Sequence, residues 1–173
     1  MAFIRTVRGH TPRFGKNCFI AENATVVGEV QTGDNCTVWF NAVVRGDVNS
    51  ITIGHNTNIQ DGAIIHCTYQ RAKTLIGNNV SIAHNAVVHG CTIHDDVLIG
   101  MGAIVMDHAI IESNCVIAAG AVVLSGTHVE AGSVYAGTPA KKISDTSEEL
   151  KAVILRTASN YPMYAEWFKE DLK

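Results

Sequence analysis

A six-residue repeat runs through most of this 173-residue chain. Aligned on its opening aliphatic residue, it reads IAENAT from Ile20 and IAHNAV from Ile82, and it continues without interruption from IHDDVL at Ile93 to YAGTPA at Tyr135. The fifth residue of each unit is almost always small, and Gly, Asn and Asp crowd the third and fourth positions, as turns require. One large and one small inward residue per unit predict the sides of a triangular parallel β-helix, in which three units make a coil of about 18 residues.

Counting sides places residues of successive coils in columns. We define side one as the side opened by IAENAT, and side two as the side that follows it. His66 and His89 then share the second, outward position of side two, about one strand spacing apart, with Arg45 at the top of their column. His84 occupies the third position of side one, directly below Asp61.

Two imidazoles in one column can share a metal ion, whereas His84 cannot easily join them within its own chain. A second copy of the chain, packed side against side about a three-fold axis, would bring its His84 to the first chain's His66 and His89. Three imidazoles with an open fourth position form a catalytic zinc arrangement. Arg45 can pair with a nearby carboxylate, and the ligands or a bound water can be oriented by Asp47, Gln60 and Asp61.

Composition limits the binding partners and the cellular compartment that we expect for this chain. The net charge of −3 favours neither nucleic acid nor an anionic membrane surface as a partner. No apolar run is long enough for a signal peptide or a membrane span, and the five cysteines include no CxxC pair. We therefore expect a reduced, cytoplasmic protein. The histidines outside the shared columns are interpreted as surface residues: His10, His55, His94, His108 and His128.

Three segments carry a resemblance to a known family: RGD at Arg45–Asp47, NIQDGAIIH at Asn58–His66 and AHNAVVHG at Ala83–Gly90. They resemble the signature of γ-class carbonic anhydrases, and the resemblance covers nearly the whole chain. It implies an all-β solenoid, a left-handed parallel β-helix followed by a C-terminal α-helix, assembled as a homotrimer.

The same resemblance implies a metal site shared between subunits. Zn(II), or alternatively Fe(II) or Co(II), would be bound by His66 and His89 of one subunit and His84 of the next. Arg45, Asp47, Gln60 and Asp61 would surround the site, with Gln60 near the bound water, and Asn58 and Tyr161 match the family pattern as well. The implied activity is that of a lyase, the reversible hydration of CO2 to bicarbonate by a metal-bound hydroxide.

The chain departs from the family at its proton carrier. The archetypal enzyme has a glutamate directly after Arg-x-Asp, where this chain has Val48, and a glutamate in the loop after the first histidine ligand. The corresponding loop here, CTYQRAKTL, contains no carboxylate. Fast turnover requires a group that takes up the released proton, so we predict weak CO2 hydration.

The last residues carry helical signals. YAGTPAKKI closes the β-helix, Thr146 opens a predicted capping box, TSEE, and apolar residues then recur at helical spacing. We expect the β-helix over residues 1–143 and a C-terminal segment over 144–173, as parts of one domain. The helix should span about 147–160 and pack on the β-helix, and Pro162 should break or bend it. Two long coils should form loops after Val48 and around Tyr69–Thr74.

Two other functions fit parts of the pattern. A hexapeptide-repeat acyltransferase that uses a CoA thioester would need one histidine as a general base and shares the closing AGTPAK segment, but it gives no reason for three histidines in two facing columns. A non-catalytic metal-binding trimer would keep the ligands and dispense with the proton carrier. Metal content of anaerobically purified protein, measured alongside CO2 hydration, separates these functions.

Overall fold

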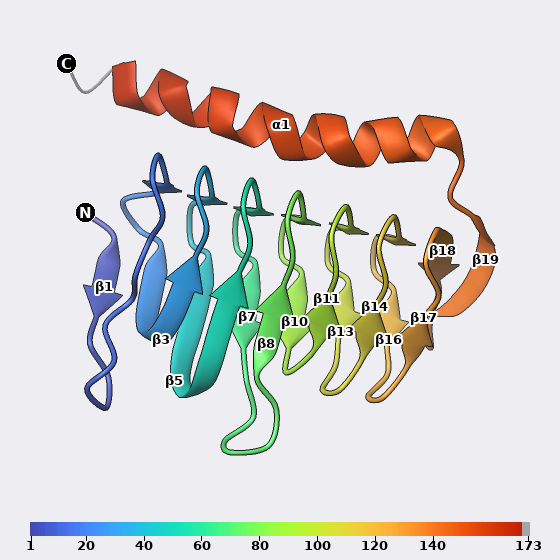
Figure 1. Ribbon diagram of the computed structural model, residues 1–173, viewed down its shortest axis with the longest axis horizontal. Coiled ribbons are helices and arrows are strands. Elements are labelled where there is room, and N and C mark those ends of the chain that lie inside the picture. The colour runs from blue at the N-terminus through green and yellow to red at the C-terminus, as the bar shows by residue number, and fades with distance from the viewer. Residues whose placement is uncertain (171–173) are drawn as a thin grey trace.

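The computed structural model describes residues 1–170, and only the backbone of residues 169 and 170. The chain winds into a parallel β-solenoid of about seven turns, followed by helix α1 (Glu148–Glu170). The coils stack along the long axis of the molecule, and α1 runs back over them from the last coil toward the first (Figure 1). The predicted fold class, a parallel β-helix of hexapeptide repeats with a C-terminal helix, is confirmed.

Each side of the solenoid is a column of short strands. Side one consists of β2 (Phe19–Ile20), β4 (Thr37–Val38), β6 (Asn58–Ile59), β9 (Ser81–Ile82), β12 (Leu98–Ile99), β15 (Val116–Ile117) and β18 (Ser133–Ala136), closed by antiparallel β19 (Lys141–Asp145). Side two consists of β1 (Phe3–Arg5), the first parts of β3 (Thr25–Thr32) and β5 (Val43–Ile53), and β7 (Ile64–His66), β10 (Val87–His89), β13 (Ile104–Val105) and β16 (Val122–Val123). Side three continues β3 and β5 and adds β8 (Thr74–Ile76), β11 (Thr92–Ile93), β14 (Ile110–Ile111) and β17 (His128–Val129).

Inward-facing residues fill the prism and fix the register of the coils. On side two, Val44 pairs with Val26 in the coil before it and with Ile65 in the coil after it, and all three are essentially buried. Each such side chain contributes about 1.5–3 kcal/mol when it leaves water. The small fifth-position residues are equally buried, namely Ala24, Ala42, Ala63, Ala86, Ala103 and Ala121. Because the aliphatic columns hold the coils in register, the outward residues of successive coils are also stacked.

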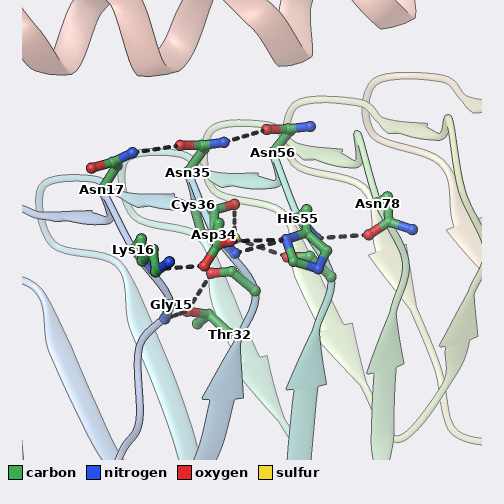
Figure 2. Close-up of polar contacts among 12 residues, drawn as sticks. Gly15, Lys16, Asn17, Thr32, Asp34, Asn35, Cys36, His55, Asn56 and Asn78 are labelled. Carbon is green, nitrogen blue, oxygen red and sulfur yellow. Dashed lines mark hydrogen bonds and ion pairs between the residues drawn. The ribbon is translucent and has the colours of Figure 1, made fainter.

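Asparagines turn one corner of the prism. Asn35 and Asn56 have φ values of 57° and 53°, in the left-handed region that asparagine tolerates better than most residues. Their side-chain amides form a ladder along the stack, in which Asn17 donates to Asn35 and Asn35 donates to Asn56 at 3.3 and 3.1 Å (Figure 2). The corner residues predicted from turn preference therefore also link one coil to the next.

The two long coils absorb their extra residues differently. Around Tyr69 the chain leaves the stack as predicted, in a loop closed by an antiparallel bridge between Thr68 and Ala72. The loop expected after Val48 is not separate, because β5 continues through this segment. The pairing with β3 shifts instead, between Gly28 and Val30. Pairing with β3 stops at Gly46 and resumes at Ile51, so the extra residues 47–50 form a bulge between the two paired parts of β5.

Helix α1 is longer than predicted. The expected end near residue 160 is wrong, since the helix continues through Pro162 to Glu170. Proline removes only its own N–H from the helical hydrogen bonds, and aromatic packing on side one holds the helix beyond it. Trp39 contacts Tyr161 and Phe168 with ring centroids 5.4 and 5.6 Å apart. No helix among residues 1–170 combines the length and the apolar character needed to cross a membrane.

The start of α1 also differs by one residue. Ser147, and not Thr146, caps the helix, because its Oγ accepts a hydrogen bond from the Leu150 N–H at 3.3 Å. Thr146 Oγ1 is buried and has no hydrogen-bond partner. Since position 150 holds leucine, a glutamate cannot complete a reciprocal capping box from Ser147.

Candidate metal centre

His66 and His89 end strands β7 and β10, whose parallel register places the two residues opposite each other. Their rings meet edge to face with centroids 5.1 Å apart. The nearest nitrogens, His66 Nδ1 and His89 Nε2, face each other at 3.1 Å. Two nitrogens bound to a tetrahedral Zn²⁺ at their usual distance lie about 3.3 Å apart. The pair could therefore bind one ion with little movement.

Asp47 holds the far edge of the His66 ring. Its Oδ1 lies 3.1 Å from His66 Nε2, and its Oδ2 accepts a hydrogen bond from Arg45 Nη1 at 2.7 Å. Burial raises the pKa of Asp47, but the hydrogen bonds from Arg45 and His66 outweigh burial and keep that pKa below its usual value. Asp47 is therefore an ionised acceptor at neutral pH, so His66 Nε2 carries the hydrogen.

Asp107 plays the same part for His89, and the sequence interpretation missed it. Its Oδ1 lies 2.5 Å from His89 Nδ1, and its Oδ2 accepts a hydrogen bond from Thr68 Oγ1 at 2.5 Å. Burial raises the pKa of Asp107, but the hydrogen bonds from Thr68 and His89 lower it below its usual value. In the repeat, Asp107 is the third residue of its unit, whereas His89 is the second residue of the unit one coil earlier. The two residues therefore fall in different columns, and the column pattern alone does not pair them.

These contacts determine which atoms of the histidine pair face each other. An ionised carboxylate only accepts hydrogen bonds, so His66 donates from Nε2 and His89 donates from Nδ1. In neutral rings the facing atoms, His66 Nδ1 and His89 Nε2, both carry lone pairs, which repel at 3.1 Å unless a cation lies between them. Burial lowers the pKa of His66, ahead of the opposing effect of Asp47. A metal ion therefore suits the position better than a proton.

His84 and Asp61 lie at the corner between side one and side two. The register of β6 on β9 stacks them, and His84 Nδ1 is 3.1 Å from Asp61 Oδ2. Their side chains are 43% and 42% exposed. Among residues 1–170, no group of three His, Cys, Asp or Glu side chains is placed to hold a metal ion. The three-histidine site remains a prediction that requires a second chain.

Of three other predicted site residues, Asn58 and Gln60 lie on side one, and Tyr161 lies in helix α1, which covers that side. Asn58 and Gln60 are buried, and Gln60 Nε2 donates to Asn58 Oδ1 at 2.9 Å while Asn58 Nδ2 donates to Ser81 Oγ at 2.8 Å. Gln60, His84 and Tyr161 line a mostly apolar hollow of about 380 Å³. Burial, followed by the charge of Asp61, raises the pKa of Tyr161 to about 12, so this phenol keeps its proton at neutral pH.

A second, polar pocket of about 170 Å³ adjoins Asp47. His10 and Glu29 are among its lining residues, and His10 Nδ1 lies 3.8 Å from Glu29 Oε2. Arg8 and Gln70 close the pocket from the N-terminal turn and the inserted loop. The position after Asp47 holds no carboxylate, but the three-dimensional structure brings one close from the preceding coil.

Three other histidines lie apart from these groups. His94 Nε2 and His128 Nε2 approach the two carboxylate oxygens of Glu112 on side three, at 3.8 and 2.8 Å. His55 Nδ1 accepts a hydrogen bond from the Asp34 backbone N–H at 2.9 Å, at the asparagine corner (Figure 2). All three side chains are exposed. The structure therefore gathers the predicted site residues into two groups, one on side two and one at the side-one corner.

Comparison with known proteins identifies relatives along nearly the whole chain. Residues 73–106 and 90–125 match the family described as "Bacterial transferase hexapeptide (six repeats)". The chain is 40% identical over 156 residues to "Gamma carbonic anhydrase 2, mitochondrial" of Arabidopsis thaliana, covering 87% of this chain and 56% of that protein. The chain thus spans little more than half the length of this plant relative.

Two further relatives match over most of their own length. A "Probable carbonic anhydrase" of Methanocaldococcus jannaschii is 45% identical over 139 residues, which cover 80% of this chain and 87% of that protein. The crystal structure of a hexapeptide transferase family protein from Anaplasma phagocytophilum superimposes with a TM-score of 0.92 at 36% identity, covering 96% of this chain and 98% of the other.

Proposed function

This chain belongs to the family of γ-carbonic anhydrase-like hexapeptide-repeat proteins, and from that membership we propose that it is a homotrimeric metalloprotein that reversibly hydrates CO2. The observation that carries the proposal is the pair of facing imidazole nitrogens in His66 and His89, 3.1 Å apart, each ring held from behind by an ionised aspartate.

The donor set fits the proposed metal. Three neutral imidazoles suit Zn²⁺, and also Fe²⁺ or Co²⁺. In carbonic anhydrases zinc lowers the pKa of its bound water to about 7, and a zinc ion held by these residues would supply a nucleophile at neutral pH in the same way. Each histidine has its own carboxylate, Asp47 for His66, Asp107 for His89 and Asp61 for His84, and such partners fix the orientation of a ligand ring.

The third ligand would come from a second chain. His84 is exposed at a corner, away from the histidine pair, and its ring nitrogen Nε2 is left free by the contact of Nδ1 with Asp61. Side two next to the pair carries exposed apolar side chains, among them Ile64, Ile104 and Leu124. Burial of such residues against another copy favours association. A prism that packs side against side closes naturally into a cyclic trimer.

Other residues of this chain would have separate roles in substrate binding and proton transfer. Arg45 neutralises Asp47, so that Asp47 can hold the His66 N–H without attracting further protons. The apolar hollow beside His84 suits an uncharged, apolar substrate such as CO2, and Gln60 and Tyr161 add polar atoms at its wall. Hydration converts CO2 and water to bicarbonate and a proton, and Val48, packed against the core, cannot accept that proton. We therefore propose weak activity.

The test is stopped-flow CO2 hydration with protein purified anaerobically and loaded in turn with Zn²⁺, Fe²⁺ and Co²⁺. We expect a rate above the uncatalysed background that His89→Ala abolishes and that His128→Ala, a histidine outside the site, leaves unchanged. Bound metal without hydration under any buffer would refute the enzymatic proposal and favour a non-catalytic metal-binding trimer. Equal activity in both variants would refute the assigned site.

A further inference from the structure

We propose that Asp107, anchored by Thr68 of the inserted loop, is a positioning residue for His89 that sets which ring nitrogen is available to a metal ion. The inference rests on the proposed metal site and adds to it a residue pair that neither the repeat pattern nor the family motifs indicate. It also gives the insertion after His66 a role in the site.

The carboxylate of Asp107 is held at both oxygens by side chains from two different segments. Oδ1 meets His89 Nδ1 and Oδ2 meets Thr68 Oγ1, each at 2.5 Å. Asp107 follows β13, His89 ends β10, and Thr68 begins the loop after β7. Rotation of the carboxylate would break both contacts. The His89 ring is therefore fixed relative to two neighbouring coils and not only to its own strand.

The loop that supplies Thr68 is itself braced. Thr68 and Ala72 exchange backbone hydrogen bonds of 3.1 and 3.2 Å, and Asn49 Nδ2, from the insertion in β5, donates to the Thr68 carbonyl at 3.4 Å. At the other end of the loop, Thr74 Oγ1 donates to the His66 carbonyl at 2.6 Å. The extra residues of both long coils thus converge on the histidine pair.

Comparison with other aspartates in the turns shows that Asp107 is not a typical corner residue. Asp34 Oδ1 accepts a hydrogen bond from the Lys16 backbone N–H, and Asp95 Oδ1 accepts one from the Asn78 backbone N–H, each at 2.7 Å. These aspartates link adjacent coils. The equivalent backbone donor beside Asp107, the Gly90 N–H, bonds instead to Thr74 Oγ1 and to the His66 carbonyl. Asp107 is thereby left to bind side chains.

The chemical consequence is a fixed tautomer. When His89 donates Nδ1–H to Asp107, its Nε2 keeps a lone pair directed at His66 Nδ1. Without Asp107, His89 would gain a hydrogen bond by moving its proton to Nε2 and donating it to the lone pair on His66 Nδ1. That tautomer blocks the position that a metal ion needs. Loss of such a partner typically weakens metal binding about 10- to 100-fold.

The experiment combines two measurements on the intact protein: the His89 tautomer in the metal-free state, from two-dimensional ¹⁵N NMR of the imidazoles, and Zn²⁺ affinity, from competition with a chromophoric chelator. In the parent protein we expect the Nδ1–H tautomer at His89. Asp107→Ala should convert it to Nε2–H and weaken Zn²⁺ binding about 10- to 100-fold. Asp107→Asn retains an acceptor oxygen, so it should keep the Nδ1–H tautomer and lose less affinity.

Two further variants separate positioning from general stability. Thr68→Val removes only the anchor and should shift affinity in the same direction by a smaller factor. Glu112→Gln, at a carboxylate that contacts two histidines outside the site, should change neither measurement. An unchanged tautomer in Asp107→Ala, or an affinity equal to that of the parent protein in both Asp107 variants, would overturn the proposal. Failure of the parent protein to bind Zn²⁺ would instead count against the proposed function, while the tautomer measurement would still decide the role of Asp107.

Discussion

If the metal site is divided between chains, two inactive variants should complement each other. A His84→Ala chain keeps the His66–His89 pair, and a His89→Ala chain keeps the histidine at the side-one corner. Each homotrimer lacks a ligand at every boundary. In a mixed trimer, a boundary between two chains has all three ligands when the chain that supplies His66 and His89 is His84→Ala and the chain that supplies His84 is His89→Ala. Only a site assembled from two chains permits this rescue.

The expected magnitude follows from the geometry. With equal amounts of the two chains and random assembly, each of the two conditions at a boundary is met about half of the time, so about one quarter of the boundaries should be complete. A matched control mixes His66→Ala with His89→Ala. These two ligands lie 3.1 Å apart in one column of one chain, so no mixed boundary can be complete and tight metal binding should stay absent.

The assay is metal content after coexpression, anaerobic purification and gel filtration of the trimer fraction. Recovery of about one quarter of the parent metal content in the first mixture, and none in the control, is the expected result. Absence of recovery in the first mixture, with heterotrimers demonstrated by mass spectrometry, would contradict the division of ligands. Equal recovery in both mixtures would contradict the assignment of His66 and His89 to one side of the site.

Three further outcomes are expected. His94→Ala and His108→Ala should leave metal content unchanged in elemental analysis, because neither residue belongs to the column of His66 and His89. Metal loss equal to that in His89→Ala would contradict this assignment. The rate of CO2 hydration should be low in dilute buffer and should rise with imidazole concentration, because imidazole can carry the released proton. Val48→Glu should restore part of the rate without raising metal affinity. A fast rate that does not depend on buffer would show that another group carries the proton. A hydrogen bond from Cys36 lowers the pKa of the Cys18 thiol to about 6. Iodoacetamide should therefore modify Cys18 selectively at pH 7, and the rate should fall as the pH drops below 6 because the thiolate is the reactive form. Peptide mapping that finds another cysteine modified faster would contradict this.

The sequence predicts the coils and the stacking of outward residues because the inward aliphatic residues allow only one register between successive coils. A large aliphatic residue every six positions can be buried only if successive coils align, and that alignment alone brings His66 opposite His89 and His84 beneath Asp61. The same logic explains why Asp107 was missed. Its contact with His89 runs diagonally between columns, and Thr68 reaches it from a loop that has no repeat to follow.

The C-terminal helix shows where local signals are insufficient. Pro162 is a sound reason to expect a helix end, but the decisive contacts come from residues more than a hundred positions earlier, Phe19 and Trp39, which pack against Phe168. Similarly, Thr146 matches a capping signature in sequence, while the folded chain buries its hydroxyl and uses Ser147. Propensity marks the region of a boundary, and tertiary packing sets its position.

Native mass spectrometry of anaerobically purified protein tests the central claim most directly, since it reports assembly and metal content in one spectrum. The shared-site account predicts a trimer that carries one divalent ion per chain and that loses its metal when it dissociates into monomers. A monomer that retains a tightly bound metal ion, or a trimer that binds none after incubation with Zn²⁺, Fe²⁺ or Co²⁺, would contradict it.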